Sequence, residues 1–321
     1  MTNFWLKLLA LVFLAGIFSF ARADYPERPI RIIVPFPPGG STDILARMMG
    51  QKLTQAWGRQ VIVDNRTGAN GILAAGLTAQ ANRDGYTLMF VAIGHAINPL
   101  LRKKLPYDTE KDFTPVSLTA VVPQVLAVHP SVKVNSVQEL IALAKSGTKP
   151  LSYASGEIGS SQHLATELMS HMAGIKLTHV PYKGGAPGLL DVIAGHVDMM
   201  INPVLSMVPH VKAGRLRALA VSTAKRNATL PDLPTMSEAG VPGYESVAWY
   251  GIVAPAGLPS SVLAKLSAEI IKGTRSSDMW DTLVSQGTEP VGSTPREFAA
   301  FIEAETAKYA KVIKQAGVKA E

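Results

Sequence analysis

The chain has 321 residues, of which 17% are charged and 47% are hydrophobic, and it contains no cysteine. This is the composition of a globular protein, and it excludes a structural disulfide, a lipid-modified amino-terminal cysteine and a cysteine-ligated metal site. The formal net charge is +7, but basic residues are scattered among acidic ones and only residues 102–104 form a basic run. A nucleic-acid surface needs basic residues gathered on one face with aromatic residues between them, so the sequence argues against a nucleic-acid partner.

The first residues have the pattern of a secretory signal. Lys7 is followed by an uncharged apolar run, residues 8–20, and then by the small-x-small sequence Ala21-Arg22-Ala23. The run is shorter than the roughly 20 residues that a membrane-spanning helix needs, which makes an uncleaved anchor the weaker alternative. We predict a signal peptide over residues 1–23, cleavage after Ala23, and a mature protein that is free in the periplasm with a net charge of +5.

Short β-branched runs alternate with amphipathic segments along the mature chain. The predicted strands are residues 30–34, 61–64, 87–92, 126–128, 151–154, 177–180, 197–201 and 216–221. The predicted helices are residues 43–57, segments after Ser136 and Ser160, a segment around 189–194, and residues 295–315. This alternation is typical of parallel sheets with helices on their faces, and the length suits two ordinary domains. The pattern predicts an α/β protein with two lobes.

Several helix starts carry the reciprocal capping pattern, in which a Ser or Thr is followed three residues later by a Glu. The pairs are Ser136 with Glu139, Thr235 with Glu238, and Thr294 with Glu297, the last with Pro295 at the first helical position.

The residues that point to chemistry lie where strands lead into helices. Residues 35–43 follow the first predicted strand, and there Gly39 and Gly40 expose backbone N–H groups next to a helix amino terminus. Such a junction binds anions, because unpaired donors and the positive end of the helix dipole point at the same place. Ser41 or Thr42 could cap the helix and also donate a hydrogen bond. Taken alone, the loop is a weak signal, and a simple turn with a helix cap is the favoured interpretation.

Three further junctions repeat the arrangement. Residues 154–163 contain Ser155, Gly156, Gly159, Ser160 and His163, residues 64–71 contain Asn70, and residues 94–99 contain His95 and Asn98. Ligands of open parallel sheets lie outside the carboxyl ends of the strands, where all four segments would fall. Together they predict a site between two lobes.

Individual side chains at these junctions leave alternatives open. Asp43 could accept a hydrogen bond from a bridging water or a ligand amine, or it could only stabilise the helix dipole. His163 could bind the ligand or pack inside its helix face, and His95 and Asn98 have the same two alternatives. Aromatic residues beside the strands could wall the pocket or belong to the core; these are Phe36, Trp249 and Tyr250.

A set of motifs in a fixed order carries a resemblance to a known family. The chain resembles the Bug family, the periplasmic receptors of tripartite tricarboxylate transporters, over essentially its whole mature length. The motifs are residues 35–43 (PFPPGGSTD) with Ala46-Arg47, Asp64-Asn65-Arg66, residues 84–87 (DGYT), 105–108 (LPYD), 179–184 (HVPYKG) and 230–235 (LPDLPT), and the stretch 249–259.

This resemblance implies a two-lobed periplasmic binding protein of the Venus flytrap kind, type II-like, with two interlobe crossings. We place the first crossing near Pro123 and the return near Ser246, so lobe 1 comprises residues 24–123 plus 247–321 and lobe 2 comprises residues 124–246. It also implies a small carboxylate ligand, membrane transporter subunits as partners, a monomer, and no metal or cofactor.

In that family the loop matching residues 38–43 holds a carboxylate, and the loop matching residues 155–163 holds a second ligand end, partly through ordered waters. The predicted ligand-binding residues are Pro38, Gly39, Gly40, Ser41, Thr42, Asp43, Asn70, His95, Ser155, Gly156, Gly159, Ser160, His163 and Asn202. Candidate ligands are di- and tricarboxylates, acidic amino acids and aromatic carboxylates.

Two other functions remain as alternatives, a ligand sensor on the same fold and a periplasmic hydrolase that uses Ser160 with His163. The hydrolase is the weaker of the two, because Ser160 does not lie in a G-x-S-x-G elbow, and no strand-to-helix loop carries a nucleotide-binding glycine motif. His163, His171 and His179 are a poor metal set, because the third lies on the next predicted strand.

Overall fold

The computed structural model describes residues 25–147 and 150–318, so the predicted signal peptide lies outside the described residues. The strands are β1 (Ile30–Val34), β2 (Val61–Asn65), β3 (Thr87–Ala92), β4 (Phe113–Val128), β5 (Ser152–Ser155), β6 (Thr178–Pro181), β7 (Met199–Pro203), β8 (Arg217–Val221), β9 (Val247–Pro255) and β10 (Glu289–Pro290). The helices are α2 (Ser41–Trp57), η1 (Ala69–Gly71), α3 (Ile72–Ala79), α4 (Gly94–Leu101), α5 (Val137–Ser146), α6 (Ser161–Ala173), α7 (Gly185–Ile193), α8 (Val204–Lys212), α9 (Ser260–Thr274), α10 (Ser277–Ser285) and α11 (Pro295–Ala316).

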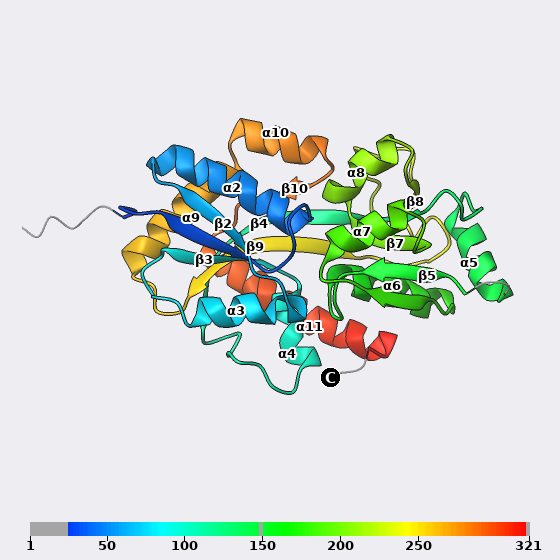
Figure 1. Cartoon of the computed structure of the whole chain (residues 1–321), viewed down its shortest axis with the longest axis horizontal. Coiled ribbons are helices and arrows are strands. Elements are labelled where there is room, and N and C mark those ends of the chain that lie inside the picture. Colours follow the sequence, from blue (N-terminus) through cyan, green and yellow to red (C-terminus); the bar gives the residue numbers. More distant parts are fainter. Residues whose placement is uncertain (1–24, 148–149, 319–321) are drawn as a thin grey trace, which may run out of the picture.

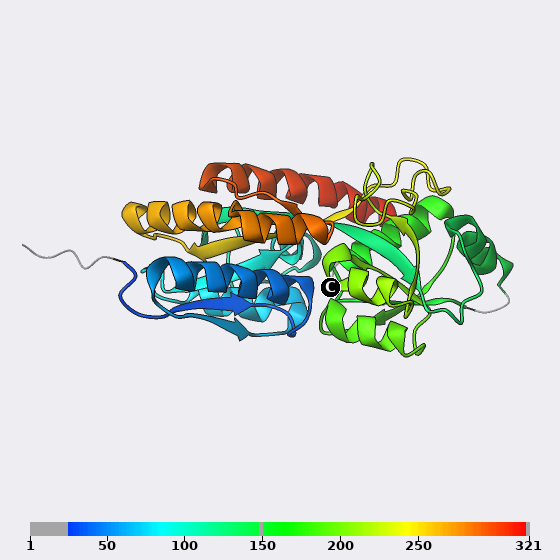
Figure 2. The same ribbon diagram turned by 90° about the horizontal axis from the view of Figure 1, so that it is seen from above.

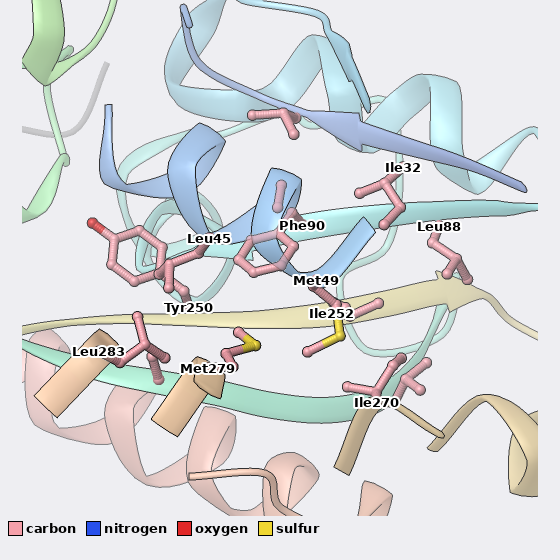
Figure 3. Close-up of a cluster of buried hydrophobic side chains, with 14 of the residues drawn as sticks. Ile32, Leu45, Met49, Leu88, Phe90, Tyr250, Ile252, Ile270, Met279 and Leu283 are labelled. Carbon is pink, nitrogen blue, oxygen red and sulfur yellow. The ribbon is translucent and has the colours of Figure 1, made fainter. Parts of the chain in front are cut away.

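Lobe 1 is built on the sheet β2-β1-β3-β9-β4 (Figure 1). The first three strands are parallel, and β9 and then β4 continue the sheet antiparallel. Helices α2, α9 and α10 cover one face through a fully apolar cluster, in which Leu45 and Met49 of α2 meet Phe90 and Ile252 of the sheet (Figure 3). Helices α3, α4 and α11 cover the other face. Because both faces are covered, most residues of the central strands β3, β9 and β4 are buried, which explains why their sequences are largely apolar.

Lobe 2 repeats this layered arrangement on a smaller sheet. The second half of β4 pairs antiparallel with β7 and β8, while β5 pairs parallel with β6 and β7. One face packs against α5 and α6 through residues such as Leu140 and Met169, and the other packs against α7 and α8 through residues such as Leu189 and Met207. The lobes lie side by side along the longest axis of the molecule (Figures 1 and 2).

Strand β4 runs through both lobes without interruption. Up to Pro123 it pairs with β9, and from Gln124 onward it pairs with β7. The chain returns beside the same point, where Ser246 Oγ donates to Gln124 Oε1 at 3.0 Å and its backbone N–H donates to Ser222 O at 3.0 Å. These pairings support the predicted crossings near Pro123 and Ser246, and the lobe boundaries themselves stay a prediction.

Helix α11 adds a third connection that the sequence did not indicate. It begins in lobe 1, packs on β4 and α4, and reaches α6 of lobe 2 (Figure 2). Leu164 of α6 belongs to the same apolar cluster as Phe298 and Tyr309 of α11. Any rotation of the lobes about the two crossings therefore also changes the packing of α6 on α11.

The α/β prediction is confirmed, as are most predicted elements to within two residues. The sequence did not predict the first half of β4 or β9, which are the strands at the crossings, and it did not predict helices α8, α9 and α10. The box of Thr294 and Glu297 opens α11 as predicted. Thr235 and Glu238 also exchange both hydrogen bonds, but only a turn follows them. At Ser136 the serine half of the box caps α5.

Candidate functional site

A cavity of about 510 Å³, counting its open mouth, lies between the lobes at the carboxyl ends of the strands. No charged side chain belongs to its wall within the described part of the chain. The lining residues are Phe36, Pro37, Gly40, Ser41, Thr42, Asn70, Ala92, Ile93, Gly156, Ser160, Ser161, Gln162, Gly184, Gly185, Ala186, Asn202, Pro203, Ser206 and Tyr250.

Four helices point their amino termini at this cavity. The residues that precede the first turns of α2, α6, α7 and α8 are Gly40, Ser160, Gly184 and Pro203, and all four lie in the wall. At α2, α7 and α8 no side chain caps the free N–H groups. A helix amino terminus carries roughly half a positive charge, so four of them around an uncharged cavity favour an anion without any lysine or arginine.

The loop before α2 is braced from behind by Asp43. Its carboxylate accepts from Gly39 N–H at 3.0 Å, from Asn65 Nδ2 at 2.9 Å and from Arg47 Nε at 3.0 Å. Burial alone would raise the pKa of Asp43, but these hydrogen bonds outweigh it and lower the pKa below its usual value. Asn65 also donates to Phe36 O at 2.9 Å. The structure therefore uses Asp43 to hold the loop, and the carboxylate does not line the cavity.

The loop before α6 is held by uncharged groups. The Ser160 hydroxyl accepts the backbone N–H of His163 at 3.3 Å and caps the helix. The His163 ring accepts Gly159 N–H through Nδ1 at 3.3 Å. Because the Ser160 hydroxyl bonds to the backbone of His163 and not to its imidazole, these residues do not form the nucleophile and base pair that a serine hydrolase requires.

A pair of histidines, the buried His163 and the half-buried His179, lies directly behind this loop. The rings of His163 and His179 have centroids 4.5 Å apart, and His179 Nε2 lies 2.7 Å from Ser155 Oγ. Burial lowers the pKa of both histidines to about 4, and the neighbouring His163 adds to the shift of His179. Tyr153 stacks on the far side of His179. Both rings are therefore uncharged at neutral pH and act as packing for the loop.

One wall of the cavity is a chain of hydrogen-bonded side chains. Gln162 Nε2 donates to Asn202 Oδ1 at 2.9 Å, and Asn202 Nδ2 donates to Ser206 Oγ at 2.9 Å. Ser206 lies 3.5 Å from the Ser41 hydroxyl of the opposite lobe. Tyr250 adds its hydroxyl beside Ser41, at one end of the lobe 1 core (Figure 3). These amides and hydroxyls can donate to and accept from a polar ligand without charge.

The two lobes touch each other around the cavity. Gly184 of lobe 2 lies so close to lobe 1 that a Cβ there would come within 2.8 Å of Pro37 Cδ. The Glu157 carboxylate of lobe 2 accepts the backbone N–H of Asn70 in lobe 1. The structure is thus a closed arrangement, in which a ligand in the cavity would contact both lobes.

The structure brings half of the predicted residues together in the cavity wall. These are Gly40, Ser41, Thr42, Asn70, Gly156, Ser160 and Asn202. The others lie outside the wall, six of them in the same two loops: Pro38, Gly39, Asp43, Ser155, Gly159 and His163. His95 lies in a smaller chamber next to the cavity. The sequence did not decide whether three aromatic residues wall the pocket or belong to the core. Phe36 and Tyr250 line the cavity, while Trp249 is fully buried in the core.

Sequence reasoning missed Gln162, Ser206 and the loop of Gly184 and Gly185. The last had a usable signal, because Gly184 and Gly185 stand between a strand and a helix like the other junctions. Gln162 lies inside the predicted junction 154–163 but was not chosen from it, and Ser206 had no signal, since only the fold brings α8 to the cavity.

Residues 25–147 and 150–318 contain neither a candidate metal site nor a candidate membrane-spanning helix. No group of three or more His, Cys, Asp or Glu side chains there is placed to hold a metal ion. No helix among them is long and apolar enough to cross a membrane.

The fold and the cleft define a two-lobed solute-binding protein. The family model described as the tripartite tricarboxylate transporter family receptor matches residues 45–318. The chain therefore belongs to this family of periplasmic solute-binding receptors, which are not enzymes, and the resemblance to the Bug family is confirmed.

Relatives and solved structures are similar to this chain over nearly its whole length. Protein BugT of Bordetella pertussis is 36% identical, with 95% of this chain and 94% of BugT covered. The structure of Rpa4515 of R. palustris with adipate is 40% identical with a TM-score of 0.88, covering 92% of this chain and 99% of that one. MatC of Rhodopseudomonas palustris with bound malate is 31% identical with a TM-score of 0.85, covering 90% and 100%.

Proposed function

We propose that this protein captures a small carboxylate in the interlobe cavity and delivers it to a membrane transporter. The convergence of four helix amino termini on a cavity carries this proposal, because the described residues place no charged side chain in the cavity wall. Backbone donors and helix dipoles are well suited to a carboxylate, and they leave the anion free to depart because no fixed cation binds it. The adipate and malate that accompany two similar structures are both carboxylates.

Ligand contact is proposed for the residues that line the cavity. Gly40, Ser41 and Thr42 at the start of α2 receive the carboxylate, and Gly156 and Ser160 contact the ligand from the opposite lobe. Asn70 and Asn202 bind its remaining polar groups. The residues behind the loops, above all Asp43 and His163, hold the loops in place and reach the ligand only through them or through water.

The proposal is tested with purified mature protein and a panel of carboxylates, uncharged amides and sugars. A ligand at one hundred times its dissociation constant should add about 2.7 kcal/mol of stability and raise the melting temperature by about 5 °C, and the ligand should be recovered unchanged. The proposal is wrong if a sugar or an amide stabilises the protein while no carboxylate does.

Closure around the ligand is tested by small-angle scattering on the same samples. The wild type should become more compact with a carboxylate. Gly184→Ala should weaken binding about tenfold and reduce the compaction, because its Cβ would meet Pro37 in the closed form. The control is Gly174→Ala, which also changes a glycine of positive φ but has no heavy atom within 4 Å of the added Cβ. Equal effects of the two variants would contradict closure at Gly184.

We also propose that the chain is exported with cleavage after Ala23, acts as a monomer, and docks on the membrane subunits of a tripartite tricarboxylate transporter. Membership of a periplasmic receptor family supports the compartment. Amino-terminal sequencing of exported protein should start at Asp24, and light scattering should give one chain per particle. Co-purification with a signalling protein in place of transporter subunits would favour the sensor alternative.

A further inference from the structure

A second, smaller chamber opens off the cavity on its lobe 1 side; its volume of about 240 Å³ includes the open mouth, and its enclosed part has room for about one water-sized group. Phe36, Asn70 and Ala92 line both spaces, so the chamber begins behind Asn70. Three buried polar atoms in its wall have no hydrogen-bond partner within the described residues: Asn70 Oδ1, His95 Nδ1 and the Tyr107 hydroxyl. Their residues are 2%, 6% and 8% exposed. Buried polar groups rarely lack a partner, so these three together indicate a binding site for a polar group.

The orientation of the Asn70 amide is fixed by its neighbour. Asn98 Nδ2 donates to the backbone carbonyl of Asn70 at 3.1 Å, which turns Asn98 Oδ1 toward Asn70 Nδ2 at 3.2 Å. A flip of either amide would place two donors or two acceptors against each other. Asn70 Oδ1 is therefore an acceptor that remains free for a group in the chamber.

The two rings of the chamber are positioned by Phe113, which meets His95 edge-on at 4.9 Å and Tyr107 edge-on at 5.4 Å between centroids. Burial lowers the pKa of His95 to about 4, so its imidazole is uncharged at neutral pH. Burial raises the pKa of Tyr107 and the nearby Asn98 side chain lowers it, but the Tyr107 hydroxyl makes no hydrogen bond of normal geometry within the described residues. An uncharged imidazole and a phenol can each donate or accept one hydrogen bond.

The charge around the chamber disfavours a second anion. No lysine or arginine belongs to its wall within the described residues. The backbone N–H of Asn70, which could have received a carboxylate, already binds the carboxylate of Glu157. A second ligand carboxylate would therefore lie close to the Glu157 carboxylate and to the unpaired Asn70 Oδ1. No lysine or arginine of the chamber wall, within the described residues, would offset the cost of removing that carboxylate from water.

We propose that the chamber receives the second end of the ligand, and that this end carries a hydrogen-bond donor, such as a hydroxyl, amide or ammonium group, instead of a second carboxylate. The donor binds Asn70 Oδ1 and the rings of His95 and Tyr107. This inference rests on the proposed function, because the first end of the same ligand is the carboxylate held in the cavity.

Calorimetric titration of the mature protein with ligands of matched length tests the inference. The four-carbon set is butyrate, γ-hydroxybutyrate, γ-aminobutyrate and succinate, and the six-carbon set is hexanoate, ω-hydroxyhexanoate, ω-aminohexanoate and adipate. At the better length, a donor-ended ligand should bind about tenfold tighter than the methyl-ended one and tighter than the dicarboxylate.

The inference is overturned if the dicarboxylate binds tightest at both lengths, or if the methyl-ended and donor-ended ligands bind equally, because the chamber then holds only water. Either result leaves the proposed function standing. If no carboxylate in these sets or in the wider panel binds, the proposed function itself is wrong.

Tyr107→Phe supplies the matched variant. It removes only the hydroxyl and should reduce the preference for donor-ended ligands about fivefold, while butyrate and hexanoate bind as before. The control is Tyr182→Phe. The Tyr182 hydroxyl donates to Asp191 at 2.6 Å, and Tyr182 lines neither the cavity nor the chamber. The melting temperature of the Tyr107→Phe variant should equal that of the wild type. If this variant keeps the wild-type preference for donor-ended ligands, the selectivity arises elsewhere and the inference is contradicted.

Discussion

Helices α2 and α6 begin in loops that face each other across the cavity, but the two loops are held by opposite means. The α2 loop is braced by an ionised carboxylate, Asp43, which binds the loop from behind and leaves the first helical N–H groups open to the cavity. The α6 loop is capped by the Ser160 hydroxyl and packed on uncharged His163 and His179. The α2 loop thus offers uncapped backbone donors close to a fixed negative charge, and the α6 loop is the more sensitive to acid.

The largest expected effect is on the lobe 1 loop. Gly40→Asp places a carboxylate where the ligand carboxylate meets α2, and two such charges 4 Å apart repel by about 4 kcal/mol, so binding should fall about a thousandfold. Gly40 has a negative φ, and an added Cβ would lie 3.8 Å from Pro37 O, which is ordinary contact. Gly40→Ala is therefore the control. If Gly40→Asp binds a carboxylate as well as Gly40→Ala, the anion site lies elsewhere.

Removing the charge of Asp43, which holds the α2 loop from behind, should lower the stability of the folded protein. Asp43→Asn replaces an acceptor of three hydrogen bonds, so the free energy of unfolding at pH 7 should fall by about 2 kcal/mol. Because the native pKa of Asp43 is lowered, its contribution is complete above the unfolded pKa and is lost as pH falls through the native value. The difference between wild type and variant in denaturant titrations should therefore vanish in strong acid.

The control for the brace is Asp281→Asn, on the exposed side of α10. Its free energy of unfolding should stay within about 0.5 kcal/mol of the wild type. An equal loss in both variants would show that Asp43 acts only through general surface charge.

Acid should destabilise the packing behind the α6 loop before it protonates Asp43 behind the α2 loop. The native pKa values of His163 and His179 are about 4, while unfolded histidines titrate near 6.5, so the unfolded state binds protons first and stability falls as pH drops from about 6.5 toward 4. His163→Gln should remove about 2 kcal/mol of that fall, measured as the difference in unfolding free energy between pH 7 and pH 4.5. His171→Gln changes an exposed residue of the same helix and should leave the pH dependence intact. A wild-type pH dependence in both variants would contradict the assignment.

The smallest expected effect concerns the cap of α6. Ser160→Ala should reduce stability by about 1 kcal/mol and weaken carboxylate binding less than tenfold. Ser136→Ala removes the equivalent cap of α5, far from the cavity, and should reduce stability equally without affecting binding. Neither the wild type nor the variants should hydrolyse esters or amides. Turnover by the wild type that Ser160→Ala abolishes would restore the hydrolase alternative.

Local sequence determined the parts of the fold whose physics is local. Strands β1 and β3 and the start of α11 follow from β-branched runs and from a capping box, which act within a few residues. The junctions before α2 and α6 were recognised because glycine and serine between a strand and a helix have few other uses. The family resemblance rested on the same short motifs, and it predicted two lobes correctly.

Tertiary structure alone decided which residues of each junction face the cavity. Asp43 and Ser41 are two positions apart in the same helix turn, yet Asp43 faces Arg47 and Asn65 behind the loop while Ser41 faces the ligand space. The first half of β4 was missed because Pro115 and Pro123 interrupt its pattern, and a proline that lacks an N–H is tolerated only where the pairing shifts or the lobes part. These outcomes depend on groups far apart in the chain, whose contacts no local pattern records, whereas the composition of the loops by itself predicted helix amino termini that are suited to an anion.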